Sequence, residues 1–535
     1  MMRTFTGTFT GTPSLVRLAL RRDRIMIPAW VLSLAVIVIG TASSISTLYP
    51  TEAGRASLAA SMAANGSLRA LYGPVYGTSI GGLTAWRMGS MGPALAGLMT
   101  LLLVVRHTRE EEEAGRLELV GAGVVGRRAP LTASLITGCG ASLLLALLIT
   151  LGLLTQGAVG AVAFGLAFGA VGCVFAAVAA VTAQLTESAR AAKGIAGALL
   201  GVAFLVRATG DAAAPGGPEW VAWLSPLGWA ERLHPYAHER WWVLALFAGV
   251  IVLLVTAAYA LVAGRDLDAG LLPSRPGPER AGRRLRGAYG LAWRLQRGSL
   301  WGWAFGYAVS GLVFGATGKG IADLGRTNKS IADEINHLGG THSLVDSFLA
   351  AMINFLGMLA AVYIVQAVLR LRGEESDGRA EPVLATAVGR LRWAASHLVI
   401  AAAGSVVLMV AGGIAMGIGY GASVSDVSGQ VPRMTGAGLV QLPAVLFVGA
   451  LAVLILGAAP KMAMASWSAA SLTLAIGLYG PLLKLSRWVL DLSAFTHLPK
   501  VPTAPATATP LLWLLVLTAA LTASGLAALR HRDMG

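Results

Sequence analysis

Two charged segments of the sequence carry side chains that can hold a charged partner, and both follow one pattern. Two adjacent glutamates precede a glycine, an arginine and a further glutamate, and a Gly-Arg step follows. Carboxylate and guanidinium groups at this spacing form ion pairs and charge-assisted hydrogen bonds. The first segment contains Glu111, Glu112, Gly115, Arg116, Glu118 and Arg127, and its counterpart in the second half of the chain contains Glu374, Glu375, Gly378, Arg379, Glu381 and Arg390.

Two interpretations of this repeated segment are open. A single copy is most simply a solvated charged turn. Because the chain carries two copies, we favour a short helix along the inner membrane face that binds a cytoplasmic partner and passes its movement to the attached spans. Glutamate near the helix start complements the helix dipole, and Gly115 and Gly378 allow a sharp change of backbone direction. Exposed ion pairs are individually weak, so they would set register more than affinity.

The sequence offers no convincing catalytic constellation and no metal site. A phosphate-binding loop of the form G-x-x-x-x-G-K followed by Ser or Thr is absent, and the fragment from Gly315 to Gly320 lacks both the spacing and the hydroxyl residue. His234 and His238 are four residues apart with Pro235 between them, and an aromatic belt is the better interpretation of this region. We therefore predict a chain that is not itself an enzyme and has no cofactor of its own.

The composition predicts the environment of these segments. Of 535 residues, 56% are hydrophobic and 13% are charged, whereas soluble domains carry roughly 25% charged residues. This excludes a soluble enzyme, a disordered chain and a disulfide-rich scaffold, and it predicts an all-α polytopic membrane protein. The net charge of +15 could indicate nucleic acid, but the basic residues interrupt apolar spans. We therefore predict the lipid bilayer, and no nucleic acid, as a partner.

Twelve apolar stretches are long enough to cross a bilayer, which requires about 20 residues. For the first stretch a cleaved signal peptide is the alternative, but similar segments continue along the chain, so we predict an uncleaved anchor. Lysine and arginine concentrate in alternate loops, which predicts that both termini are cytoplasmic. The predicted spans are 27–46, 88–105, 129–156, 158–183, 194–210, 241–263, 299–316, 347–369, 393–420, 436–458, 467–484 and 511–529.

The two halves of the chain correspond beyond the charged segments. Each half holds six predicted spans, and each charged segment follows the second span of its half. Two arginines and a tryptophan near the start of each half also share one spacing: Arg21, Arg24 and Trp30, then Arg294, Arg297 and Trp303. We predict two parallel six-helix repeats at 1–263 and 299–535, joined by a basic cytoplasmic linker with an amphipathic helix at 264–298.

The charged segment, the Gly-Arg step and the long third span together resemble ABC-2 type ABC-transporter permeases. In that family the segment is the coupling helix that docks on the nucleotide-binding ATPase. The run from Ser225 to Trp229 before span six, and its counterpart from Asp491 to Pro499, resemble the family's segment before the last span. The fused double length is most similar to actinobacterial exporters of polyketide antibiotics, of the tetronasin-resistance type.

This resemblance implies the membrane subunit of an ATP-driven exporter of hydrophobic drugs or antibiotics that works by alternating access. One chain would bind two copies of a separate ATPase, which holds ATP and Mg²⁺, and a hydrophobic small-molecule substrate. The second segment departs from the first at Ser376, Asp377 and Pro382, which implies unequal ATPase contacts. A proton-coupled antiporter with twelve spans is the alternative, although it should carry carboxylates inside its spans. A membrane enzyme is a further, less favoured class.

Polar and adaptable side chains inside the spans are candidates for substrate contact. A polar residue in a span needs a partner or a function, while Met and aromatic side chains accept varied hydrophobic molecules. Interhelical packing is the alternative for all of them. By the family resemblance, spans two and five of each half line the path. The candidates are Met91, Met99, Thr100, Phe204, Met352, Asn354, Phe355, Met358 and Gln366.

Overall fold

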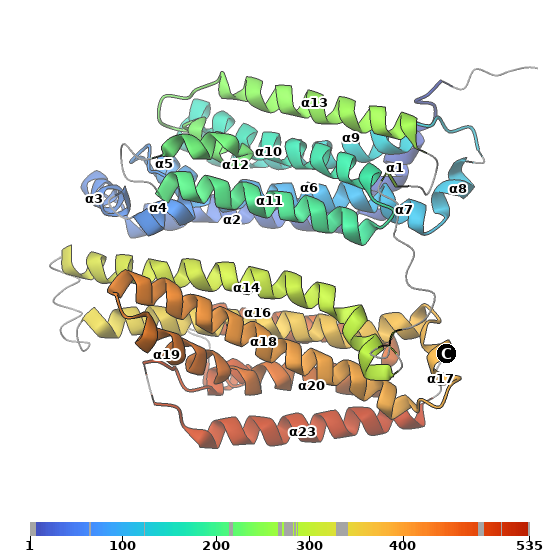
Figure 1. Cartoon of the computed structure of the whole chain (residues 1–535). Coiled ribbons are helices and arrows are strands. Elements are labelled where there is room, and N and C mark those ends of the chain that lie inside the picture. Colours follow the sequence, from blue (N-terminus) through green and yellow to red (C-terminus); the bar gives the residue numbers. More distant parts are fainter. Residues whose placement is uncertain are drawn as a thin grey trace, which may run out of the picture. The chain divides into compact units, whose positions relative to one another are not determined.

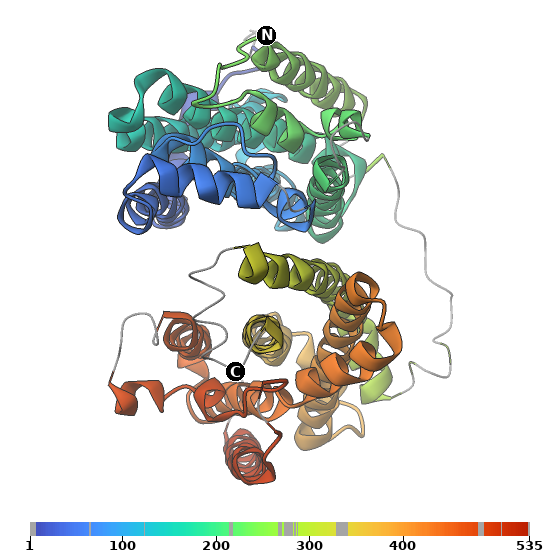
Figure 2. The same ribbon diagram turned by 90° about the vertical axis from the view of Figure 1, so that its left-hand side faces the viewer.

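The computed structural model contains two compact helical units, Met1–Gly277 and Pro278–Gly535 (Figure 1). It describes residues 7–532 apart from 64–65, 122, 213–217, 266–269, 272–281, 283–284, 286, 328–340, 480–485 and 504. Within these residues the regular elements are helices, and none is a strand. Figure 2 shows, for each unit separately, long helices that lie side by side in a bundle.

The first unit is built around a central helix, α10. Its sequence is rich in alanine and glycine and is apolar on all sides, which is the pattern of a helix surrounded by others. Small side chains let its neighbours approach closely: a Cβ on Gly172 would lie 1.9 Å from the Ser142 hydroxyl oxygen of α9. The helices are α1 Thr12–Arg22, α2 Met26–Leu48, α3 Glu52–Ala63, α4 Gly66–Tyr72, α5 Ile80–Met88, α6 Met91–Arg106, α7 Arg109–Glu113, α8 Arg116–Gly121, α9 Ala129–Leu153, η1 Leu154–Gln156, α10 Ala158–Leu185, α11 Ala189–Ala212, η2 Glu219–Leu224, α12 Pro226–Arg232 and α13 Val243–Gly264.

The second unit is built around the close pair of α14 and α18. Gly311 and Gly315 of α14 face the backbone of α18, and an added Cβ would lie 2.4 Å from the Gly412 carbonyl oxygen and 2.2 Å from that of Met416. Glycine is required there because any larger side chain would separate the two helices. The helices are α14 Ala288–Thr327, α16 Thr341–Ser376, α17 Ala380–Leu384, α18 Arg390–Val424, α19 Val427–Leu439, α20 Leu442–Ala458, η4 Pro460–Met462, α21 Ala465–Tyr479, α22 Arg487–Leu490, η5 Ala494–His497 and α23 Ala508–His531.

Ten helical segments among the described residues are long and apolar enough to cross a membrane, which confirms the predicted all-α polytopic class. Each overlaps one of the twelve predicted spans. The other two predicted spans lie on helices that do not belong to these ten. Span 299–316 lies within α14, and span 467–484 begins in α21 and ends outside the described residues.

The long helices follow the same order in both units. A charged loop comes after the second long helix, α6 in the first unit and α16 in the second. The next long helix begins at the Gly-Arg step, α18 at Arg390 itself and α9 at Ala129, two residues after Arg127. One difference is at the start of each unit. In the first unit the amphipathic α1 is separated from α2 by a turn, whereas in the second unit α14 continues without a break.

The contact between α14 and α18 generates a stability prediction. Replacing Gly315 with Leu should force the two backbones apart and lower the free energy of unfolding by about 1–3 kcal/mol, as overpacking commonly does. A thermal melt of the purified chain in detergent measures this. The matched control is Gly436→Leu in α19, because a Cβ at Gly436 has no atom within 4 Å. Equal melting temperatures for the two variants would contradict the close packing.

Candidate functional site

The first charged loop joins α6 to α9 and is held by four consecutive glutamates. Glu110 pairs with Lys193 of α11, and Glu113 accepts a hydrogen bond from the backbone N–H of Ala189, at the start of the same helix (2.7 Å). Glu111 and Glu112 bind other elements. Between α7 and α8 the chain turns at Gly115, whose φ of +66° is the left-handed conformation that glycine adopts most readily.

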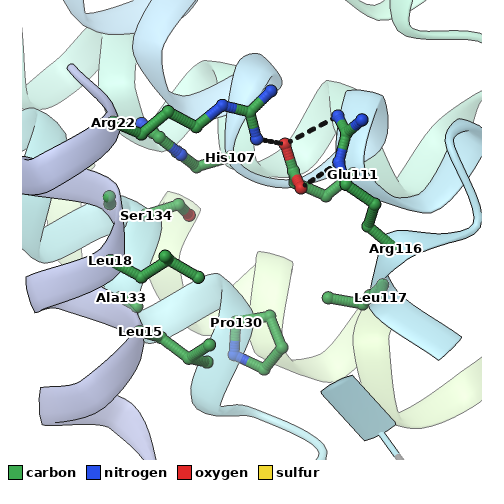
Figure 3. Close-up of a pocket in the computed structure, with 11 residues that line it drawn as sticks. Leu15, Leu18, Arg22, His107, Glu111, Arg116, Leu117, Pro130, Ala133 and Ser134 are labelled. Atoms are coloured by element: carbon green, nitrogen blue, oxygen red, sulfur yellow. Dashed lines mark hydrogen bonds and ion pairs between the residues drawn. The ribbon is translucent and has the colours of Figure 1, made fainter. Parts of the chain in front are cut away.

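Glu111 lies between two arginines at one edge of a small cavity (Figure 3). Arg22 of α1 pairs with one side of the carboxylate, and the Arg116 Nε donates to Oε2 at 2.8 Å. The cavity has a volume of about 60 Å³ and lies among α1, the charged loop and α9. Leu15, Leu18 and Leu117 form part of its apolar lining. Through these contacts the loop is attached to the amphipathic helix that precedes the first long helix.

Glu112 connects the loop to the end of the last long helix. Its carboxylate is buried and pairs with Arg265, the residue directly after α13, at 2.6 Å and 3.0 Å. Arg109 pairs with the same carboxylate. Arg127 of the Gly-Arg step donates to the backbone carbonyl of Arg265. We call Glu112, Arg265 and Arg127 the first lock.

The second charged loop repeats this arrangement. Glu375 pairs with Arg532, the residue directly after α23, at 2.6 Å, and with Arg372 at 3.4 Å. Arg390 of the second Gly-Arg step donates to the backbone carbonyl of Arg532 at 2.9 Å. We call Glu375, Arg532 and Arg390 the second lock. As in the first loop, a glycine at positive φ makes the turn, here Gly378 at +69°.

The two loops also share an ion pair on their outer edge. Glu374 accepts from the Arg379 Nε at 3.1 Å, as Glu111 does from Arg116. The hydrogen bond to Glu374 raises the pKa of Arg379, so its guanidinium stays charged. The loops differ next to this pair: Glu113 caps α11 in the first loop, whereas its counterpart Ser376 is exposed in the second.

The paired carboxylates have little surface left for a partner. Glu112 and Glu374 are buried, and the Glu375 side chain is 6% exposed. The exposed members of the two predicted segments are Arg116, Glu118, Arg127, Gly378, Arg379, Glu381 and Arg390. The repeated glutamates were predicted from the sequence, whereas Arg265 and Arg532 were not predicted as their partners.

In the first unit the predicted substrate contacts lie in different environments. Met99 and Thr100 are buried, and the Thr100 hydroxyl donates to the Gly172 carbonyl at 2.7 Å, which ties α6 to α10. Met91 is exposed. The Arg207 guanidinium lies over the Phe204 ring, and its central carbon is 4.5 Å from the centroid of that ring.

A buried charged cluster near Phe204 was not predicted. Arg207 is fully buried and contacts Glu231 at 3.1 Å and Asp211 at 3.5 Å, and Arg232 pairs with Asp211 at 3.0 Å. Ser90 donates to Glu231 at 2.6 Å, and burial raises the pKa of Glu231 to about 8. The spacing of Arg207 and Asp211 on one helix was the available sequence signal. The cluster joins the ends of α11 and α12 to the start of α6.

In the second unit the predicted contacts lie on α16. Gln366 is exposed and accepts from the Trp303 indole N–H at 2.9 Å, while Phe355 contacts the Phe314 ring at a centroid distance of 6.2 Å. Met358 is buried, and Met352 and Asn354 are half-buried. The Asn354 Oδ1 atom is buried and has no hydrogen-bond partner among the described residues.

These features define a multi-pass helical membrane protein whose buried ion pairs connect helix ends. Residues 285–530 match the family described as the multidrug efflux system permease Rv1217c, C-terminal domain. The chain is also 45% identical over 529 residues to the multidrug efflux system permease protein Rv1217c of Mycobacterium tuberculosis (strain ATCC 25618 / H37Rv), which covers 98% of this chain and 96% of the relative. The chain therefore belongs to this family of multidrug efflux permeases, as a transport protein of the bacterial inner membrane.

The locks generate a prediction about local opening. Arg265→Gln or Arg532→Gln leaves a buried carboxylate without its main partner, a change that costs about 3–5 kcal/mol in buried pairs. Backbone amide exchange in residues 109–118 or 374–384, respectively, should then accelerate at least roughly tenfold, as measured by hydrogen–deuterium exchange. The controls are Arg190→Gln and Arg530→Gln, since both side chains are exposed. Unchanged exchange in both lock variants would show that the locks do not hold the loops.

Proposed function

We propose that the chain is the membrane subunit of an ATP-driven exporter of the ABC-2 type, which moves hydrophobic drugs or antibiotics by alternating access. A separate ATPase would bind ATP and Mg²⁺, because the sequence contains no phosphate-binding loop. Membership of the multidrug efflux permease family supports the transport role. The resemblance to polyketide-antibiotic exporters of the tetronasin-resistance type supports the direction and the class of substrate.

The observation that carries the proposal is the duplication of the lock. The same glutamate–arginine pair and the same arginine–carbonyl bond recur in two units, at the end of the last long helix each time. A solvated charged turn has no need of such contacts. A loop that receives force from a partner does need them, because the force must reach the spans.

The geometry gives a direct mechanical route. A partner bound to the exposed Arg116 or Arg379 side chain would move its loop, and the loop would move the end of α13 or α23 with it. The buried pair is strong enough for this role, because breaking one costs about 3–5 kcal/mol, whereas exposed pairs contribute about 0–1 kcal/mol. The Gly-Arg step extends the connection to the start of α9 or α18.

The number of loops sets the number of partners. One chain carries two charged loops, one in each unit, so one chain should bind two ATPase copies without a second permease chain. The loops are unequal, since the first ties four glutamates to its neighbours and the second has serine and aspartate after its glutamate pair. The first contact should therefore be the more rigid of the two.

Native mass spectrometry of the purified complex tests this function. The expected assembly is one permease chain with two ATPase subunits. Arg116→Glu or Arg379→Glu should each remove one ATPase copy, because each reverses an exposed charge on one loop without touching a lock. The exposed Arg530→Glu is the control and should leave both copies bound. A complex with two permease chains, or ATPase binding unaffected by reversal at either loop, would contradict the proposal.

A further inference from the structure

Helix α14 has glycines on two faces, and only one face is explained by packing within the second unit. Gly311 and Gly315 lie against the backbone of α18. A Cβ added to Gly298, Gly302 or Gly306 would have no atom within 4 Å. These three glycines are spaced four residues apart, so they form one stripe, which we call the open glycine face. Close packing against the rest of the unit does not require glycine there.

The open glycine face belongs to a cavity of drug size. The cavity, which we call the α14 groove, has a volume of about 440 Å³. Small-molecule sites commonly measure about 300–1,000 Å³ and combine apolar walls with a few polar groups. Besides the glycines, its lining consists of Ser299, Trp303, Tyr307 and Ser310 from α14, and of Leu356 and Leu359 from α16.

The aromatic walls of the groove are fixed in place. The Trp303 indole N–H donates to the Gln366 Oε1 atom at 2.9 Å, and the Tyr307 hydroxyl donates to the Leu356 carbonyl at 2.7 Å. The Trp303 ring also contacts the Tyr363 ring edge-on, at a centroid distance of 6.1 Å. Both polar hydrogens are therefore used within the protein, which leaves ring surface for an apolar ligand. A groove with walls held this way is preorganised for binding.

Two hydroxyl groups in the groove have no hydrogen bond to any described residue. Serine and threonine in an apolar helix usually donate to a carbonyl of the preceding turn, as Thr317 does to Val313 and Ser405 does to Ala401. Ser299 and Ser310 line the groove and make no such bond. They are eleven positions apart on the helix, or about 16 Å along its axis. They are available to donate to acceptor atoms of a bound molecule.

We propose that the α14 groove binds a neutral, largely apolar substrate that carries hydrogen-bond-accepting oxygens. The walls are apolar and aromatic, the polar groups are hydroxyl donors, and no ionisable group with a charge at neutral pH lines the cavity. A cationic compound would find no counter-ion there. The proposal rests on the proposed export function for its biological meaning, but binding itself requires neither ATP nor an ATPase.

The groove gives two of the predicted substrate contacts on α16 a different role. Gln366 is a positioning residue, because it holds the Trp303 ring that forms a wall of the groove. Phe355 acts at the same helix seam, since it contacts Phe314 of α14. The groove therefore lies between the first and second long helices of the unit, rather than between the second and fifth.

Photo-crosslinking with benzophenone tests the proposal. Benzophenone is neutral and aromatic, and its one carbonyl oxygen accepts hydrogen bonds. The purified full-length chain in lipid nanodiscs is irradiated, and adducts are mapped by mass spectrometry. Saturable adducts are expected on the peptides that contain Trp303 and Leu356. Gly302→Leu should lower their yield roughly tenfold, because a leucine side chain occupies the groove, while its Cβ has no protein atom within 4 Å.

The control is Gly249→Leu on α13, where a Cβ also meets no atom within 4 Å; this variant should label like the wild type. If Gly302→Leu fails to fold, the Ser299→Ala, Ser310→Ala double variant decides, and it should lower the yield several-fold. Unchanged labelling in the variant that folds overturns the proposal. Adducts spread over all exposed helices, or a phospholipid retained by the wild type and lost in Gly302→Leu, also overturn it. A failure of ATPase binding leaves this result unaffected.

Discussion

A buried carboxylate must be paired, and in each unit the pairing of one glutamate determines how the charged loop is connected. Glu112 and Glu375 bind the arginines that directly follow α13 and α23. Because these carboxylates are largely shielded from water, their ion pairs resist separation far better than exposed ones. In both units the lock therefore links the charged loop to the end of the last long helix and to the start of the third long helix. The glycines at positive φ complete the arrangement by turning the chain where each loop needs it.

The two units use this connection with different surroundings. In the first unit the loop is also tied to α1 and to the start of α11, and the far end of α11 carries the buried cluster around Arg207. In the second unit the loop makes fewer attachments, whereas α14 offers the open groove. Among the described residues of the second unit, the largely buried carboxylates are Glu374 and Glu375, both in the charged loop, with side chains 7% and 6% exposed. The first unit is thus the more firmly braced by charge, and the second provides the apolar cavity.

Much of the fold followed from local sequence. Composition and apolar length predicted the helical spans, and the repeated Glu-Glu and Gly pattern predicted where the loops turn at Gly115 and Gly378. The partners Arg265 and Arg532 were missed because they stand at different distances from their loops, so no repeated spacing marks them. The groove was missed for a related reason. Glycine in a span looks the same in sequence whether a helix packs on it, as at Gly311, or nothing does, as at Gly302.

The most direct test of the lock is the number of drug molecules transported for each ATP hydrolysed, measured in liposomes that contain the permease and the ATPase that we propose as its partner. Glu375→Arg alone and Arg532→Glu alone should each keep ATP hydrolysis while lowering this ratio roughly tenfold, because the loop no longer moves α23. The double variant restores opposite charges and should recover most of the ratio, since the pair is rebuilt with its signs exchanged. A wild-type ratio in both single variants would contradict the account.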